Sequence, residues 1–120
     1  MSDDSDNPVL DRAAIARLDR LGGTDFVRQM VELYLQHGPE RMRALEQGVR
    51  DGDAAQVERA AHSLKSSAGN FGAVRLELAA LFLESRSFEG TVDAAAAERV
   101  REEYAAADIA LRALLQELGK

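Results

Sequence analysis

The residues of this chain best suited to chemistry lie in one short segment, residues 60–73, with the sequence AAHSLKSSAGNFGA. The segment holds His62, with Lys65 three positions later, among small side chains and glycines. A histidine can act as a nucleophile near neutral pH, and a lysine beside it can hold an anion. The only other histidine is His37, and the chain has no cysteine. Covalent chemistry at a histidine would therefore fall on His62.

A helix over this segment would expose His62 and bury the opposite face. Successive residues of an α-helix are rotated by about 100° around its axis. The residues within about 60° of His62 on such a helix are polar or small: Glu58, Arg59, Lys65, Ser66 and Gly69. The opposite side carries apolar residues: Val57, Ala60, Leu64, Ala68 and Phe71. We therefore expect an exposed histidine that a large partner can reach.

A histidine on a polar face can also be simply solvated, and this interpretation competes with a chemical one. Lys65 would lie one turn away on the same face, where its charge favours the neutral, nucleophilic imidazole and can hold an anion carried by His62. Ser66 and Gly69 are small and leave the ring accessible. Together these neighbours favour a histidine that accepts a phosphoryl group and is approached by another protein.

The elements that must position this segment are all predicted to be helices. Apolar residues recur at spacings of three and four, and no alternating strand pattern is present in the sequence. Proline removes a backbone donor and clashes with the preceding turn, so a kink or break is expected at Gly38-Pro39. The expected helices span residues 11–22, 24–52, 54–70 and 73–88, and a last one begins at Thr91 or Asp93 and continues to 118.

Short connections between long helices favour antiparallel neighbours. The sequence therefore predicts an all-α, up-down antiparallel four-helix bundle with an additional short N-terminal helix that covers one end or flank. The chain of 120 residues is expected to form a single domain over residues 8–120, long enough for a core of its own. Residues 1–7 are acidic and are expected to be a disordered tail.

Composition and charge exclude several classes of protein. The absence of cysteine removes disulfides and thiolate metal sites. No apolar run approaches the roughly 20 residues that span a membrane, and the acidic N-terminus lacks the features of a signal peptide. The net charge of −6 argues against a general nucleic-acid binder, which needs a basic face. We expect a cytoplasmic protein that binds neither nucleic acid nor a membrane.

The segment around His62 resembles the signature of the histidine-containing phosphotransfer (HPt) domain family. That signature is a histidine, any residue, an aliphatic residue, a lysine and a glycine, followed by small residues and a later glycine. It is matched by His62, Leu64, Lys65 and Gly69. Ser66 stands where glycine is common, and its hydroxyl could hydrogen-bond to a phosphoryl group or to the imidazole. The resemblance covers roughly residues 10–90 and is most specific at its centre.

The resemblance implies a phosphohistidine carrier of a two-component phosphorelay. His62 would accept a phosphoryl group from a receiver-domain aspartate and pass it to another receiver aspartate, and Lys65 would stabilise the phosphate. The implied partners are response-regulator receiver domains and a hybrid histidine kinase, and the protein itself is expected to be a monomer. No ATP site or autonomous kinase activity is expected, since the chain has no glycine-rich phosphate loop. Any Mg²⁺ would come with the receiver.

Two further expectations concern other residues. Leu78 and Phe82 lie on a second apolar side of the helix over residues 73–88, which is either buried under another helix or a docking patch for a receiver. His37 is expected at a helix end or on the surface, because a metal site would need ligands that the sequence does not cluster.

Two alternatives to the phosphorelay stay open. One is the phosphoacceptor domain of a chemotaxis-type kinase, which receives its phosphate from ATP. The other is a helical adaptor without catalytic activity. Transfer of a phosphoryl group from a receiver discriminates between them and the phosphorelay.

Overall fold

The computed structural model describes residues 6–119, so the first five residues of the predicted acidic tail lie outside the described part. All regular secondary structure over residues 6–119 is helical. The four helices are α1 (Arg12–Asp51), α2 (Ala54–Asn70), α3 (Val74–Phe88) and α4 (Ala94–Leu118).

Three of the helices begin at an aspartate that caps them. A cap side chain accepts a hydrogen bond from one of the first backbone N–H groups, which have no partner inside the helix. The Asp11 side chain accepts from the N–H of Ala13, and the side chains of Asp53 and Asp93 do the same for α2 and α4. Gly52 ends α1 in the left-handed region, with φ of 65°, which a glycine adopts without strain.

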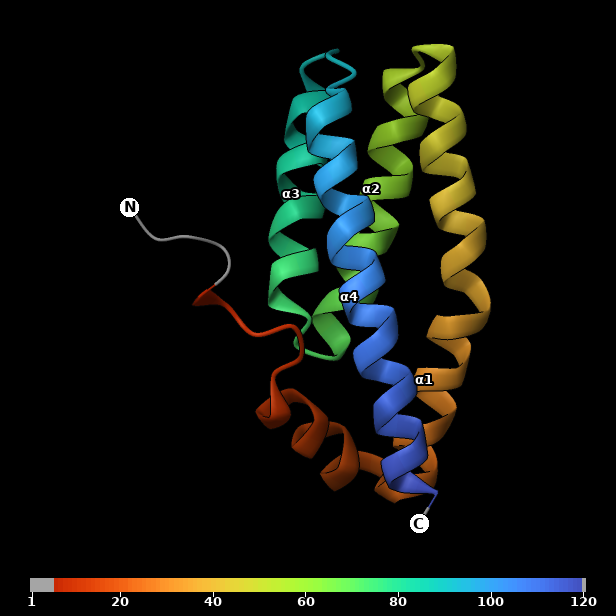
Figure 1. The fold of residues 1–120 in the computed structure, drawn as a ribbon, viewed down its shortest axis with the longest axis vertical. Coiled ribbons are helices and arrows are strands. Elements are labelled where there is room, and N and C mark those ends of the chain that lie inside the picture. The colour runs from red at the N-terminus through yellow and green to blue at the C-terminus, as the bar shows by residue number, and fades with distance from the viewer. Residues whose placement is uncertain (1–5, 120) are drawn as a thin grey trace.

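The four helices form an up-down bundle in which sequence neighbours lie side by side. Figure 1 shows α1 running up, α2 down, α3 up and α4 down along the long axis of the molecule. Over the described residues, α1 packs on α2 and α4, and α3 packs on the same two helices. The predicted all-α bundle is confirmed, and the turn of residues 71–73 places α2 and α3 antiparallel as immediate neighbours.

The N-terminal part of α1 crosses the end of the bundle. Residues 12–22 precede Gly23, whose φ of 82° and ψ of −179° are not helical, and the chain changes direction there (Figure 1). A separate short helix was expected over residues 11–22, and two helical stretches of α1 meet at the kink at Gly23. The bend lets the N–H of Asp11 donate to the carbonyl of Gly72 at 2.9 Å, so this segment lies against the α2–α3 turn.

Of the kink or break expected at Gly38-Pro39, the break is wrong, because α1 continues through Pro39 with helical backbone angles on both sides. The glycine before the proline has no Cβ and so avoids part of the clash that pushes such a residue out of the helical region. Gly38 is buried against Tyr104, and a Cβ there would collide with the tyrosine hydroxyl. Packing of the long helix on α4 therefore outweighs the missing backbone donor.

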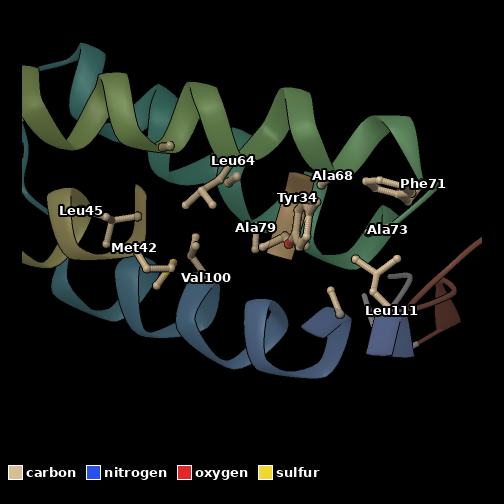
Figure 2. Packing of buried hydrophobic residues seen from close by; sticks show 14 of the residues in the cluster. Tyr34, Met42, Leu45, Leu64, Ala68, Phe71, Ala73, Ala79, Val100 and Leu111 are labelled. Atoms are coloured by element: carbon tan, nitrogen blue, oxygen red, sulfur yellow. The ribbon is translucent and has the colours of Figure 1, made fainter. Parts of the chain in front are cut away.

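The core lies between the four helices and consists mainly of aliphatic side chains (Figure 2). Tyr34 and Phe71 meet edge to face with ring centroids 5.6 Å apart. Burial raises the pKa of Tyr34 above its ordinary value, and the neighbouring Tyr104 adds to this effect. The largest fully buried side chains are Phe71, Leu45, Leu64, Leu76, Leu83, Leu111, Val27, Val31, Val57 and Val100.

Candidate functional site

Helix α2 exposes His62 as its sequence pattern predicts. The side chain is 60% exposed. The opposite face of the helix is buried, and its members are Val57, Ala60, Ala61, Leu64 and Ala68. Because the core side chains all lie on that face, a substitution of His62 leaves no cavity in the core. The imidazole is therefore presented by the fold without contributing to its packing.

A carboxylate from the next helix joins the two predicted site residues. Glu84 of α3 places Oε2 at 2.6 Å from Nδ1 of His62 and Oε1 at 2.6 Å from Nζ of Lys65. The Glu84 side chain is only 17% exposed and Lys65 is 26% exposed, so water screens this pair less than it would an open surface pair. The structure thus brings His62 and Lys65 together through a third residue.

Glu84 stays ionised in this arrangement. Partial burial would by itself raise the pKa of its carboxyl, but hydrogen bonds and charge from Lys65 and His62 outweigh that effect and hold the pKa below its ordinary value. An ionised carboxylate can only accept hydrogen bonds. Nδ1 of His62 must therefore carry the proton, which leaves the lone pair of a neutral ring on Nε2. The contact selects the nitrogen that can act as a nucleophile.

The sequence patterns alone indicated no role for Glu84. A signal for that role was present in the tight connection between α2 and α3. Two antiparallel helices joined by a short turn bring residues at similar distances from the turn next to each other. His62 precedes the turn by about as many residues as Glu84 follows it. An acidic residue near this position of α3 could therefore have been predicted to contact His62.

The other predicted residues around His62 differ in their roles. Arg59 and Ser66 are exposed, and Glu58 is half-buried at a hollow of about 320 Å³ that it shares with Glu84. Gly69 faces α3, where a Cβ would lie 3.2 Å from Oε2 of Glu77. The small residue at this position therefore leaves room for the Glu77 carboxylate beside α2.

The apolar residues of α3 outside the core lie on two sides of the helix. Leu78 and Phe82 are 37% and 56% exposed and line a groove of about 560 Å³ with α4, so they are not buried under another helix. Leu81 and Phe88 are 44% and 78% exposed, and Phe88 lines the hollow beside Glu84. On an ideal helix Leu81 and Phe88 fall within about 60° of Glu84, whereas Leu78 and Phe82 lie more than about 100° away.

Two arginines of α3 form ion pairs with acidic residues of α4 or its N-cap. Arg86 pairs with Asp93 at the start of α4 at 3.2 Å. Arg75 pairs at 3.0 Å with Glu103, whose side chain is 3% exposed. No group of three histidine, cysteine, aspartate or glutamate residues within 6–119 could hold a metal ion, and no helix in that range is long and apolar enough to cross a membrane.

An up-down helical bundle with a surface histidine, a carboxylate on Nδ1 and a lysine one turn away defines a protein that can carry a group on a histidine. The Hpt domain profile matches residues 29–119, and the chain belongs to this family. The match includes the whole of α2, α3 and α4 with the three site residues. Family membership confirms the resemblance seen in the sequence and supports a histidine phosphotransfer protein of a phosphorelay.

A solved structure shows the same fold. Histidine-containing phosphotransfer protein B (HptB) from Pseudomonas aeruginosa PAO1 is 28% identical and superposes with a TM-score of 0.85. The alignment covers 92% of this chain and 96% of HptB. No curated protein sequence gave a significant match.

Proposed function

We propose that this protein carries a phosphoryl group on Nε2 of His62, taking it from the phosphorylated aspartate of one receiver domain and passing it to the aspartate of another. The observation that carries this proposal is the contact of the Glu84 carboxylate with Nδ1 of the exposed His62. It leaves the lone pair of the neutral ring on Nε2. Glu84 also holds Lys65, whose ammonium can turn toward a phosphoryl group on the ring.

The reaction needs little covalent help from the protein. Phosphoryl transfer depends mainly on in-line positioning and on stabilisation of charge on the phosphate oxygens. Nε2 attacks the phosphorus of the aspartyl phosphate, the N–P bond forms, and the electron pair of the breaking P–O bond leaves with the receiver carboxylate. Glu84 fixes the ring, and Lys65 offsets the charge of the phosphate. Mg²⁺ is supplied by the receiver domain.

The direct test is phosphoryl transfer from a phosphorylated receiver domain to this protein in the presence of Mg²⁺. We expect a label that is labile to acid and resistant to base, as for a phosphorus–nitrogen bond. Absence of label with several receivers, together with label from a kinase and ATP, would favour the ATP-fed alternative. Absence of label from both sources would favour a helical adaptor.

The lysine gives a prediction of its own. We expect Lys65→Ala to slow transfer from the receiver by about tenfold and to shorten the lifetime of the phosphohistidine, because a charge-assisted contact to the phosphate contributes about 1.5–3 kcal/mol. Rapid-mixing measurements of label against time check the rate. Arg20→Ala removes an exposed cation on the N-terminal segment and serves as the control. Equal rates and lifetimes for Lys65→Ala and the control would remove Lys65 from the mechanism.

We further propose that the receiver docks on the exposed apolar residues of α3. The sequence prediction selected Leu78 and Phe82, whereas Leu81 and Phe88 lie on the side of Glu84. We expect Phe88→Asp to raise the receiver concentration for half-maximal transfer by about tenfold, since an exposed aromatic anchor contributes about 1–2 kcal/mol to an interface. Phe82→Asp is the matched change in the groove toward α4. If only Phe82→Asp raised this receiver concentration, docking would be assigned to the groove between α3 and α4.

The remaining features are proposed from the family resemblance and from the sequence. The partners are response-regulator receiver domains and a hybrid histidine kinase, the compartment is the cytoplasm, and the working unit is a monomer. Neither ATP nor a metal ion is bound by this chain itself. The direction in which phosphate flows is set by the partners.

A further inference from the structure

We propose that Glu84 keeps the phosphorylated ring of His62 protonated at Nδ1, so that the phosphoryl group remains on a good leaving group and can be passed on. This inference rests on the proposed function and adds to it a role for the carboxylate after the transfer. Glu84 acts here as a positioning residue, since it reaches the phosphoryl group only through the ring.

The protonation of Nδ1 determines the charge of the ring when the phosphoryl group leaves it. When the Nε2 lone pair forms the bond to phosphorus, the Nδ1 proton stays and the ring becomes a cation. In the onward step a receiver carboxylate forms the new P–O bond, the N–P electron pair returns to Nε2, and the ring leaves as a neutral imidazole. If Nδ1 had lost its proton to water in between, the ring would have to leave as an anion, which is a much poorer leaving group.

The geometry allows Glu84 to contact the ring both before and after phosphorylation. Its contact is made to Nδ1, and the phosphoryl group is attached to the other nitrogen, so the 2.6 Å contact need not break on phosphorylation. An opposite charge at hydrogen-bond distance favours the charged form of a titrating group. Glu84 is itself held ionised by Lys65 on its second oxygen. A hydrogen-bonded carboxylate therefore favours the cationic ring.

The other charged groups around His62 are farther from Nδ1 or are engaged elsewhere. On α2 the face carries Glu58, Arg59 and Lys65, of which Lys65 is paired with Glu84. On α3 the next acidic residue of the same face is Glu77, close to Gly69 and two turns from Glu84. On α1 the groups that face this side of α2 are Glu40 and Arg41, at a hollow that they share with Arg59 and Ser63. Glu84 is the only carboxylate within 6–119 with a hydrogen bond to His62.

Phosphorus NMR of the phosphorylated protein tests the inference. The full chain is phosphorylated with phosphoramidate, a small donor with a P–N bond, in a His37→Gln background so that a single phosphohistidine signal is observed. The phosphorus shift is then followed against pH for this protein and for its Glu84→Gln variant. Glutamine keeps the shape and an acceptor oxygen but removes the charge. Glu77→Gln is the matched control on the same helix face.

We expect the midpoint of the titration to fall by about one pH unit in Glu84→Gln and to be unchanged in Glu77→Gln. Near neutral pH the variant should also hold its phosphoryl group longer and transfer it to a receiver about tenfold more slowly. An unchanged midpoint in Glu84→Gln overturns the inference while leaving the proposed function intact. Failure of a phosphorylated receiver to label His62 overturns the proposed function and the inference with it.

A second measurement needs no variant and therefore does not depend on how Glu84→Gln folds. Nitrogen NMR of the phosphorylated protein reports directly whether Nδ1 carries a proton. We expect a protonated Nδ1 near neutral pH. An unprotonated Nδ1 under these conditions overturns the inference.

Discussion

His62→Gln is expected to accept no phosphoryl group from any receiver while it keeps the helical fold. Glutamine has no nitrogen lone pair that can attack phosphorus, so the covalent step is removed and not merely slowed. His62 lies opposite the buried face of α2, so its replacement leaves no cavity. Phosphate-affinity electrophoresis after incubation with a phosphorylated receiver and Mg²⁺ measures the label, and circular dichroism measures the helix content.

The matched control for this experiment is the second histidine. His37 is exposed on α1 and lines a shallow hollow with Leu33 and Arg41, without a carboxylate on its ring in the described residues. His37→Gln should be labelled as strongly as the unchanged protein. A label that persists in His62→Gln and disappears in His37→Gln would contradict the assignment of the nucleophile.

The largest effect on stability is expected from Leu64→Ala, two residues after His62. Leu64 is fully buried between the helices, and its truncation removes apolar contacts and leaves a cavity. We expect a loss of about 2–5 kcal/mol in the free energy of unfolding, measured by urea denaturation. Because Leu64 faces away from His62, phosphoryl acceptance per folded molecule should be unchanged in the absence of denaturant.

Leu21→Ala is the control for this second change. Leu21 is 78% exposed on the N-terminal segment, so its truncation removes little buried surface, and we expect a loss below about 1 kcal/mol. If Leu64→Ala were no less stable than Leu21→Ala, the assignment of Leu64 to the core would be contradicted.

The features that could be predicted from the sequence are those that depend on local residue patterns. Asp93, one of the two residues at which the last helix was expected to begin, caps it, because a capping side chain needs only the backbone N–H groups that follow it. The exposed position of His62 also follows from the rotation per residue within one helix. These arguments need no knowledge of how the helices pack on one another.

The features that could not be predicted depend on contacts between helices. The role of Glu84 follows from the register of α3 against α2, which apolar periodicity leaves open. The helix through Pro39 follows from the packing of Gly38 on Tyr104, a residue far away in the sequence. For Leu78 and Phe82, a second apolar side of α3 was visible in the sequence, but whether that side lies toward His62 of α2 depends on how the helix is rotated in the bundle.

The division of α2 into a buried face and a reactive face has a consequence for how such proteins diversify. The buried residues that hold the helix in the bundle do not overlap with the exposed residues around His62. Exposed positions such as Arg59 and Ser66 can therefore change with little cost in folding free energy. Under the proposed function, duplicated copies of the gene can acquire separate partners through these positions while they keep His62. Surface substitutions alone are then enough to prevent cross-reaction between two such signalling pathways.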